Sequence, residues 1–269
     1  MKHRMVICLT AALVSSVLSA CGGGEDSALS VQGRTLQKMA SAAAPAVSFS
    51  DPPGSNFDLT PFTLQLPTGS SGKITTVSGS DLAAGYTDPT YFYTDSTDGS
   101  MVMMDPTQGW TTSGSRHPRT ELRENAIWDT SGTNKLNATV AVTQVPDHTA
   151  IGQIFQGTGP SKPLCELQVN SSGGVQLLLE DTNQGGSATI YPIATVPVGS
   201  TFDYELSLSG STITVTVNGT VSTFTMDSSF EGESFYFKAG NYDQTAVSGP
   251  PLTTPGTVVK FYALTLTHE

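Results

Sequence analysis

Cysteine is scarce in this 269-residue sequence, which contains only three. Cys8 lies in an N-terminal apolar run and Cys21 directly after it, so the rest of the chain keeps one thiol, Cys165. A single cysteine excludes an internal disulfide, and packing of a core must therefore hold the fold. We expect Cys165 to be a buried packing residue without a catalytic role.

Positive charge is also scarce. The chain has 12 Lys and Arg residues against 23 Asp and Glu residues, which gives a formal net charge of −11. This balance argues against nucleic acid or an anionic membrane surface as a partner. It does not exclude a polyanionic sugar, because the local charge of a groove matters more than the total charge. Arg116, Arg119 and Arg123 cluster within one short segment.

Helical periodicity is nearly absent after the first 20 residues, and several catalytic motifs are absent altogether. The sequence has no zinc-ligand spacing, no phosphate-binding glycine loop, no Gly-x-Ser-x-Gly segment and no repeat of fixed period. These absences argue against the reaction classes that depend on a zinc site, a phosphate-binding loop or a serine nucleophile of the Gly-x-Ser-x-Gly type. We expect neither a metal site nor a cofactor.

The first 20 residues predict an export signal. Lys2 and Arg4 precede an apolar run over residues 5–18, which is too short to span a bilayer as a stable helix. The run ends at Leu18-Ser19-Ala20-Cys21, which resembles a bacterial lipoprotein cleavage site, and a flexible Gly22-Gly23-Gly24 follows. Cys21 is then the lipidated first residue; a plain secretory signal is the alternative.

This interpretation sets the domain organisation and the location. Residues 1–20 are the signal, residues 21–50 are the lipidated cysteine and a flexible linker, and residues 51–269 form one domain. We expect an exported bacterial lipoprotein of the outer membrane, on its periplasmic or cell-surface side. Its contact with the membrane is through the lipid anchor alone, and we expect a monomer.

The domain is predicted to be all-β. Residues 212–224 show this best, because two alternating runs flank Asn218-Gly219, the preferred chemistry of a tight hairpin turn. So many short alternating segments without βαβ spacing indicate a sandwich or jelly roll. Further strands are expected at residues 136–144, 150–156, 165–170, 175–180, 202–208, 234–239 and 258–267.

Three segments carry the residues suited to chemistry, and the first is Arg119-Thr120-Glu121-Leu122-Arg123. Residues two apart in a strand face the same side, so Arg119, Glu121 and Arg123 share one face. The two guanidinium groups can bind sugar carboxylates while the glutamate between them holds them in place. A solvated strand face with a row of ion pairs explains this segment equally well. We interpret Glu124, which follows the segment directly, as a solvated or turn residue.

The other two segments are weaker when taken singly. In residues 152–156, Gln153 and Phe155 lie on the face opposite Ile154, and a glutamine among apolar residues needs polar partners if it is buried. In residues 236–244, we expect the chain to leave a strand at Gly240 and to direct Lys238 and Tyr242 toward one region. The alternative for Gln153 is a purely structural role, hydrogen-bonded to backbone groups. The alternative for residues 236–244 is an aromatic core segment followed by a surface turn.

Together, and in this order, the three segments resemble polysaccharide lyase family 7, the alginate lyases. That family has an Arg-x-Glu-Leu-Arg strand, a Gln-Ile/Val-His strand and a Tyr-Phe-Lys-Ala-Gly-x-Tyr-x-Gln strand. Residues 57–69 also resemble its opening strand, so the resemblance spans the domain. It implies a β-jelly roll, a concanavalin-like sandwich whose concave sheet forms a substrate groove.

The resemblance also implies roles for individual residues. Arg119 and Gln153 would hold the uronate carboxyl group and disperse the charge that develops during β-elimination, and Tyr242 would protonate the O4 leaving group. Glu121, Arg123, Lys238 and Gln244 would contribute to substrate binding. The departure is Phe155, which stands where the family has the histidine usually given the role of base.

Two replacements for that base remain open. Tyr242 can serve as both base and acid when H5 and O4 lie on the same side of the sugar ring, as in mannuronate or glucuronate, provided that Lys238 and Arg119 lower its pKa. His117, two residues before Arg119, is the other candidate, because histidine titrates near neutrality. In guluronate, H5 lies on the opposite face from O4 and one residue cannot easily serve both, so we expect the loss of the histidine to favour mannuronate or glucuronate.

The expected function is therefore a polysaccharide lyase that cleaves an acidic polyuronate, with mannuronate-rich alginate preferred, and leaves 4,5-unsaturated ends. Two alternatives stay open. One is a lyase acting on another polyuronate such as glucuronan, and the other is a polyuronate-binding β-sandwich without activity.

Overall fold

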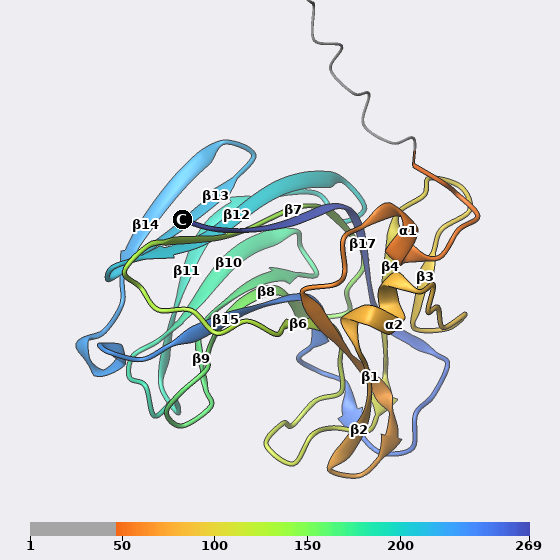
Figure 1. The fold of residues 1–269 in the computed structure, drawn as a ribbon, viewed down its shortest axis with the longest axis horizontal. Coiled ribbons are helices and arrows are strands. Elements are labelled where there is room, and N and C mark those ends of the chain that lie inside the picture. The colour runs from red at the N-terminus through yellow and green to blue at the C-terminus, as the bar shows by residue number, and fades with distance from the viewer. Residues whose placement is uncertain (1–46) are drawn as a thin grey trace, which may run out of the picture. The chain divides into compact units, whose positions relative to one another are not determined.

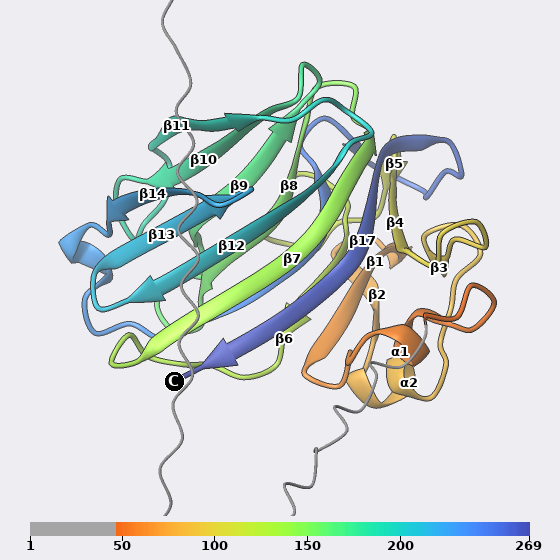
Figure 2. The same cartoon turned by 90° about the horizontal axis from the view of Figure 1, so that it is seen from above.

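The computed structural model describes residues 47–269, in which two large antiparallel β-sheets pack face to face (Figure 1). Seen from above, the strands of both sheets run in similar directions (Figure 2), as expected of an aligned sandwich. This part of the chain is an all-β jelly roll, which confirms the predicted fold class. The predicted signal and the lipidated Cys21 lie outside the described residues.

The first sheet has eight strands in the order β11-β10-β9-β8-β15-β6-β1-β2. Strands that are distant in sequence, such as β6, β8 and β15, are thus neighbours at its centre. The bounds of its strands are β1 Phe62–Ser70, β2 Lys73–Val77, β6 Thr120–Glu124, β8 His148–Gln156, β9 Pro163–Asn170, β10 Gly174–Glu180, β11 Ala188–Thr195 and β15 Phe235–Asp243.

The second sheet has seven strands in the order β14-β13-β12-β7-β17-β4-β3. Their bounds are β3 Phe92–Thr94, β4 Met101–Pro106, β7 Thr133–Gln144, β12 Thr201–Ser209, β13 Thr212–Val217, β14 Thr220–Thr225 and β17 Pro255–His268. The remaining elements are short: the parallel pair β5 Gln108–Gly109 and β16 Val247–Ser248, the helices α1 Pro53–Asn56 and α2 Gly79–Ala83, and the 3-10 turn η1 Ser228–Phe230.

The core lies between the two sheets and follows from the alternation of the strands. Leu122 of β6 and Ile154 of β8 point inward and are fully buried, as are Leu206 and Val215 of the opposite sheet. Burial of such side chains supplies the stabilisation that disulfides cannot. Cys165 is fully buried in the same core, as predicted, and burial raises the pKa of its thiol to about 12.

The predicted strands are all present, and most extend further than the alternation indicated. The hairpin turn is confirmed: Asn218 and Gly219 both have positive φ, 48° and 79°, as the tight turn between β13 and β14 requires. The expected break at Gly240 is wrong, because β15 continues to Asp243. The strands that were not predicted are β2, β3, β4, β11 and the short pair β5 and β16. Of these, β4 is buried along its whole length and so lacks alternation.

Residues ahead of the predicted domain boundary already contact the folded body. The backbone N–H of Ser48 donates to Asn56 Oδ1 at 2.9 Å, and the Asn56 amide donates back to the Ser48 carbonyl at 2.7 Å. The boundary at residue 51 stays a prediction. Within residues 47–269, no helix is long and apolar enough to cross a membrane.

Candidate active site

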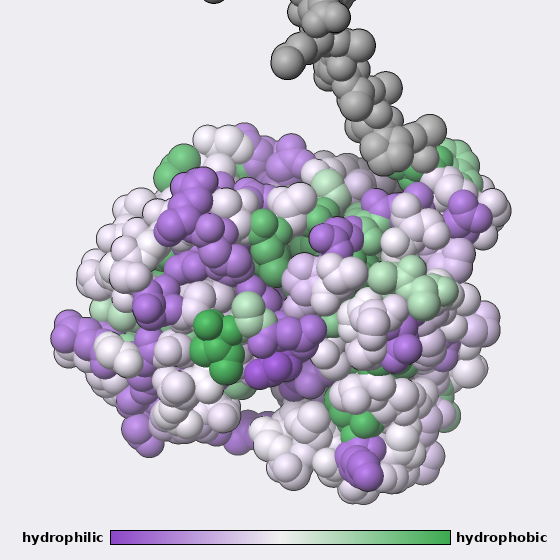
Figure 3. Space-filling model, in the orientation of Figure 1, coloured by the Kyte–Doolittle hydropathy of each residue, from purple (hydrophilic) through white to green (hydrophobic). Residues whose placement is uncertain are grey.

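A cleft of about 650 Å³ lies on the face of the eight-stranded sheet that is turned away from the core. Its lining comes from β1, β6, β8, β9, β10, β15 and the first residue of β11, and from loop segments that include residues 112–117, 161–162 and 185–187. Figure 3 shows the molecule hollowed on this side, with hydrophilic side chains gathered beside the hollow. A second cavity, of about 320 Å³ over the other sheet, is lined by no arginine, lysine or histidine.

The cleft brings together the residues that the three sequence segments predicted. Glu121 is the exception, because its side chain is buried beneath the surface of the cleft and does not line it. The predicted residues that line the cleft are His117, Arg119, Arg123, Gln153, Lys238, Tyr242 and Gln244.

Strand pairing explains why these segments meet. β15 lies between β8 and β6, and its Lys238 is in register with Gln153 on one side and Arg123 on the other. Alternation along β6 then sends Leu122 into the core and leaves its charged neighbours on the cleft side. Gly240 permits the close approach of β15 to β6, since a Cβ atom there would lie 2.6 Å from the Glu121 Cα atom.

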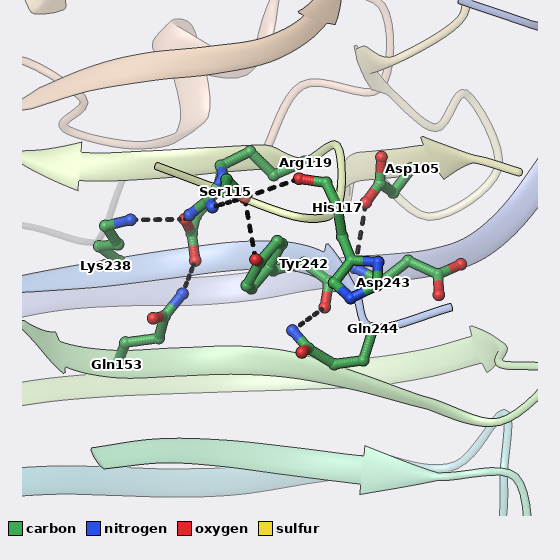
Figure 4. Close-up of polar contacts among 10 residues, drawn as sticks. Asp105, Ser115, His117, Arg119, Gln153, Lys238, Tyr242, Asp243 and Gln244 are labelled. Atoms are coloured by element: carbon green, nitrogen blue, oxygen red, sulfur yellow. Dashed lines mark hydrogen bonds and ion pairs between the residues drawn. The ribbon is translucent and has the colours of Figure 1, made fainter. Parts of the chain in front are cut away.

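Glu121 holds three cleft residues in place. Its Oε2 atom accepts from Arg119 Nη1 at 2.9 Å and from Lys238 Nζ at 3.3 Å, and its Oε1 atom accepts a hydrogen bond from Gln153 Nε2 (Figure 4). A carboxylate only accepts, so the Gln153 amide must turn its NH₂ group toward Glu121. The Gln153 Oε1 atom has no partner among the described residues.

This cluster carries an excess of positive charge. Arg119 and Lys238 are both nearly fully buried, and one carboxylate, Glu121, stands against their two charges. Burial and the nearby Arg119 lower the pKa of Lys238 to about 8, although Glu121 acts in the opposite direction. Burial on its own raises the pKa of Glu121, but Lys238 and Arg119 outweigh it and hold that pKa below its usual value.

Tyr242 lies at the end of the cleft nearest the loop of residues 112–117. The Arg119 guanidinium stacks over its ring, with Cζ 3.9 Å from the ring centre, and its hydroxyl group is 2.9 Å from Ser115 Oγ. Burial raises the pKa of Tyr242, and the nearby Arg119 offsets this only in part. The lowered pKa that a phenolate base would need is therefore not found.

His117 lies beside Tyr242, with the two rings edge to face and their centres 6.1 Å apart (Figure 4). Its Nδ1 atom is 2.8 Å from the carbonyl oxygen of Ala246. A carbonyl can only accept, so Nδ1 carries the proton, and in the neutral ring Nε2 keeps its lone pair. His117 thus has the tautomer of a general base in the cleft.

Phe155 lies at the other end of the same row of side chains. Lys238 Nζ is 4.5 Å from the centre of the Phe155 ring. The centres of the Phe155 and Tyr236 rings are 5.4 Å apart. Arg123 stacks on Tyr236, with Cζ 4.1 Å from the ring centre. This end of the cleft therefore presents cations and aromatic faces.

Three polar residues escaped prediction. Ser115 contacts Arg119, Tyr242 and the backbone of His117, but it lies in a loop where no periodicity indicates its direction. Glu166 lines the cleft opposite Gln153, and burial raises its pKa. Glu124, which the sequence indicated as solvated, is buried and accepts hydrogen bonds from Trp128 Nε1 and the Phe237 backbone.

Gln244, predicted to bind substrate, lines the cleft beyond Tyr242, and its Nε2 atom donates to the Tyr242 carbonyl oxygen at 3.1 Å. Among residues 47–269, no group of three or more His, Cys, Asp and Glu side chains is placed to hold a metal ion.

Comparison with known proteins identifies the family. The family model described as alginate lyase matches residues 57–268. Among curated protein sequences, none matches the chain significantly.

Solved structures give the same result. A variant of the family 7 alginate lyase A1-II′ in complex with a product (GGG) is 30% identical, with a TM-score of 0.73, covering 82% of this chain and all of that one. Alginate lyase PA1167 from Pseudomonas aeruginosa is 28% identical, with a TM-score of 0.71, over 79% of this chain and all of that one. The alginate lyase from Klebsiella pneumoniae is 25% identical, with a TM-score of 0.69, over 81% and 99%. The chain therefore belongs to the alginate lyases of polysaccharide lyase family 7.

Proposed function

We propose that the protein cleaves mannuronate-rich alginate by β-elimination and leaves 4,5-unsaturated uronate ends. The observation that carries this proposal is the uncompensated positive charge of the Arg119, Lys238 and Glu121 cluster. Two buried cations that share one carboxylate are only partly balanced, so a second carboxylate entering the cleft gains more there than on an open surface. Each uronate unit of the polymer brings one such carboxylate.

Elimination begins with that carboxylate. Removal of the C5 proton places negative charge on the carboxyl group, and donors already aimed at it lower the barrier. Arg119 keeps guanidinium N–H groups beyond those given to Glu121 and Ser115, and Gln153 keeps a second amide N–H. Glu121 fixes both side chains, so little reorganisation is needed when the charge develops.

Tyr242 and His117 share the proton transfers. The raised pKa of Tyr242 favours the protonated phenol, which is the form that can protonate O4. His117 keeps Nε2 as a free acceptor and is the base for the C5 proton. Of the two replacements for the missing histidine, the geometry favours His117.

The preference for mannuronate follows from where the acid and the base lie. His117 and Tyr242 stand next to each other, so both approach the sugar ring from one end of the cleft. In mannuronate, H5 and O4 lie on the same side of the ring. In guluronate they lie on opposite sides, so the reaction would need a base apart from this pair, and Phe155, at the position of the family's histidine, cannot accept a proton. Glucuronan shares the mannuronate relationship and is the second candidate substrate.

We also propose that the protein works outside the cytoplasm, tethered by a lipid at Cys21, and acts as a monomer. The apolar run that ends at Leu18-Ser19-Ala20-Cys21 supports the export signal and the lipid site. A large polyanion cannot readily cross a membrane, so an enzyme that degrades it has to be exported.

A product assay tests the proposal. Purified protein is mixed with polymannuronate, polyguluronate and glucuronan, and the unsaturated product is followed by its ultraviolet absorbance. We expect the fastest product formation on polymannuronate and a loss of about 10²- to 10⁴-fold in the Tyr242→Phe variant. Binding without any product would support a binding module instead, and faster cleavage of polyguluronate would contradict the mannuronate preference.

A further inference from the structure

The Ser115 hydroxyl group makes three hydrogen bonds, and their directions can be assigned. Arg119 Nη2 donates to Oγ at 2.7 Å, since a guanidinium has no acceptor. Oγ donates to the carbonyl oxygen of His117 at 2.9 Å, since a carbonyl has no proton to give. The third partner is the Tyr242 hydroxyl group at 2.9 Å, where either oxygen could be the donor.

The first two bonds decide the third. A serine hydroxyl has one proton and two lone pairs. Its proton is already directed at His117 and one lone pair is taken by Arg119, so only an acceptor site remains. Tyr242 must therefore be the donor, which requires its phenol to be protonated.

We propose that Ser115 is a positioning residue of this lyase, which holds Tyr242 as the protonated general acid and ties it to the loop that carries the base His117. This inference rests on the proposed function, in which Tyr242 protonates O4. The contacts join three functional groups at one atom: the guanidinium that binds carboxylate, the phenol that gives the proton and the backbone of the histidine that takes one. Figure 4 shows Ser115 between Arg119 and Tyr242.

The position of Ser115 suits this role. Its side chain is only half-buried and lies in a loop, so no strand packing depends on it. Arg119 remains fixed by Glu121 when Ser115 is removed, because the Glu121 contact uses the other terminal nitrogen, Nη1. Loss of the serine hydroxyl should therefore affect proton delivery more than substrate binding.

The test replaces Ser115 by Ala and by Thr, with polymannuronate as the substrate. We expect Ser115→Ala to lower kcat about tenfold while KM stays within about twofold, since one hydrogen bond to the acid is lost. Ser115→Thr keeps a hydroxyl group and should recover most of the activity. Ser115→Gly removes the same hydroxyl and replaces Ser115→Ala if that variant does not fold, as judged by circular dichroism.

A double-variant comparison separates positioning of Tyr242 from a general effect on the loop. In the Tyr242→Phe variant, whose phenol is already gone, we expect Ser115→Ala to cause no further loss. An equal fractional loss with and without the Tyr242 hydroxyl, or unchanged turnover in Ser115→Ala, overturns the inference.

The unaltered protein in the same assay distinguishes the two levels of failure. If it forms no unsaturated product, the proposed function fails and the inference falls with it. If it cleaves polymannuronate and Ser115→Ala cleaves it equally well, only the role of Ser115 is refuted.

Discussion

The two ends of the cleft differ in the chemistry that they can perform. At one end, Tyr242 and His117 place a proton donor and a proton acceptor side by side. At the other end, Phe155 and Tyr236 present ring faces to Lys238 and Arg123. The cluster of Arg119, Lys238 and Glu121 lies between them. One end is therefore suited to proton transfer, whereas the other can bind a sugar but has little means to deprotonate it.

The comparison teaches how one substitution can alter specificity without altering the fold. A histidine in place of Phe155 would give each end a base, and sugars of either configuration at C5 could react. With phenylalanine, acid and base come from one end only. The strands and the charge cluster stay the same, so under the proposed mechanism the substitution leaves uronate binding intact and changes which uronate can be deprotonated.

The largest effect is expected from removing the base at the reactive end. His117→Ala should lower kcat on polymannuronate by about 10²- to 10⁴-fold, because general base catalysis contributes on that order. KM should change little, since the carboxylate is held by Arg119 and Gln153. Initial rates of unsaturated product formation measure both quantities.

A matched control for this change is available in the chain. His148, at the start of β8, does not line the cleft, and its nearest charged partner is Asp147 at 3.3 Å. His148→Ala should keep the turnover of the unaltered protein. If His117→Ala also keeps it, Tyr242 is the base after all and the division of roles between the two residues is wrong.

The next largest effect is expected at the other end. Phe155→His restores a proton acceptor there, and we expect the rate on polyguluronate relative to polymannuronate to rise about tenfold. This is below the usual contribution of about 10²- to 10⁴-fold from general base catalysis because the Lys238 ammonium lies close by. Phe155→Asn is the control, since it is polar and similar in size to histidine but does not titrate. A ratio that is the same in both variants would show that the missing histidine does not set the specificity.

The sequence predicted the convergence of the cleft residues because strand alternation is a strong geometric rule. Arg119, Gln153, Lys238 and Tyr242 all lie on the side that alternation and the family resemblance assigned to them. Ser115 could not be predicted, because it belongs to a loop and its three partners come together only in the folded chain.

Two misjudged residues have physical explanations. Glu124 shares a face with Leu122 and Thr120, so alternation already indicated the core side; its charge suggested solvent instead. Its partners, among them Trp128 Nε1, satisfy the buried carboxylate. Gly240 suggested the end of a strand, but glycine is needed there because β15 approaches the β6 backbone too closely for a Cβ atom.

The smallest expected effect concerns the charge between the two ends. The pKa of Lys238 is lowered to about 8 by burial and by Arg119, so the lysine loses its proton as the pH rises from 7 to 9. The charges of Glu121 and Arg119 then cancel, and the cluster loses its net positive charge. We expect kcat/KM, which reports the free enzyme, to fall about three- to tenfold over this range through a rise in KM.

Lys238→Arg is the variant that checks the origin of this pH dependence. Arginine stays charged throughout the range, so the fall in kcat/KM between pH 7 and 9 should disappear. Tyr242 does not interfere, because its pKa is raised above the ordinary value of 10.0 and the acid stays protonated. A fall that persists in Lys238→Arg would assign the titration to another group.

Added salt gives a second check of the same pH dependence. Salt screens the attraction of a charged cluster for a polyanion, so the difference in kcat/KM between pH 7 and pH 9 should shrink as ionic strength rises.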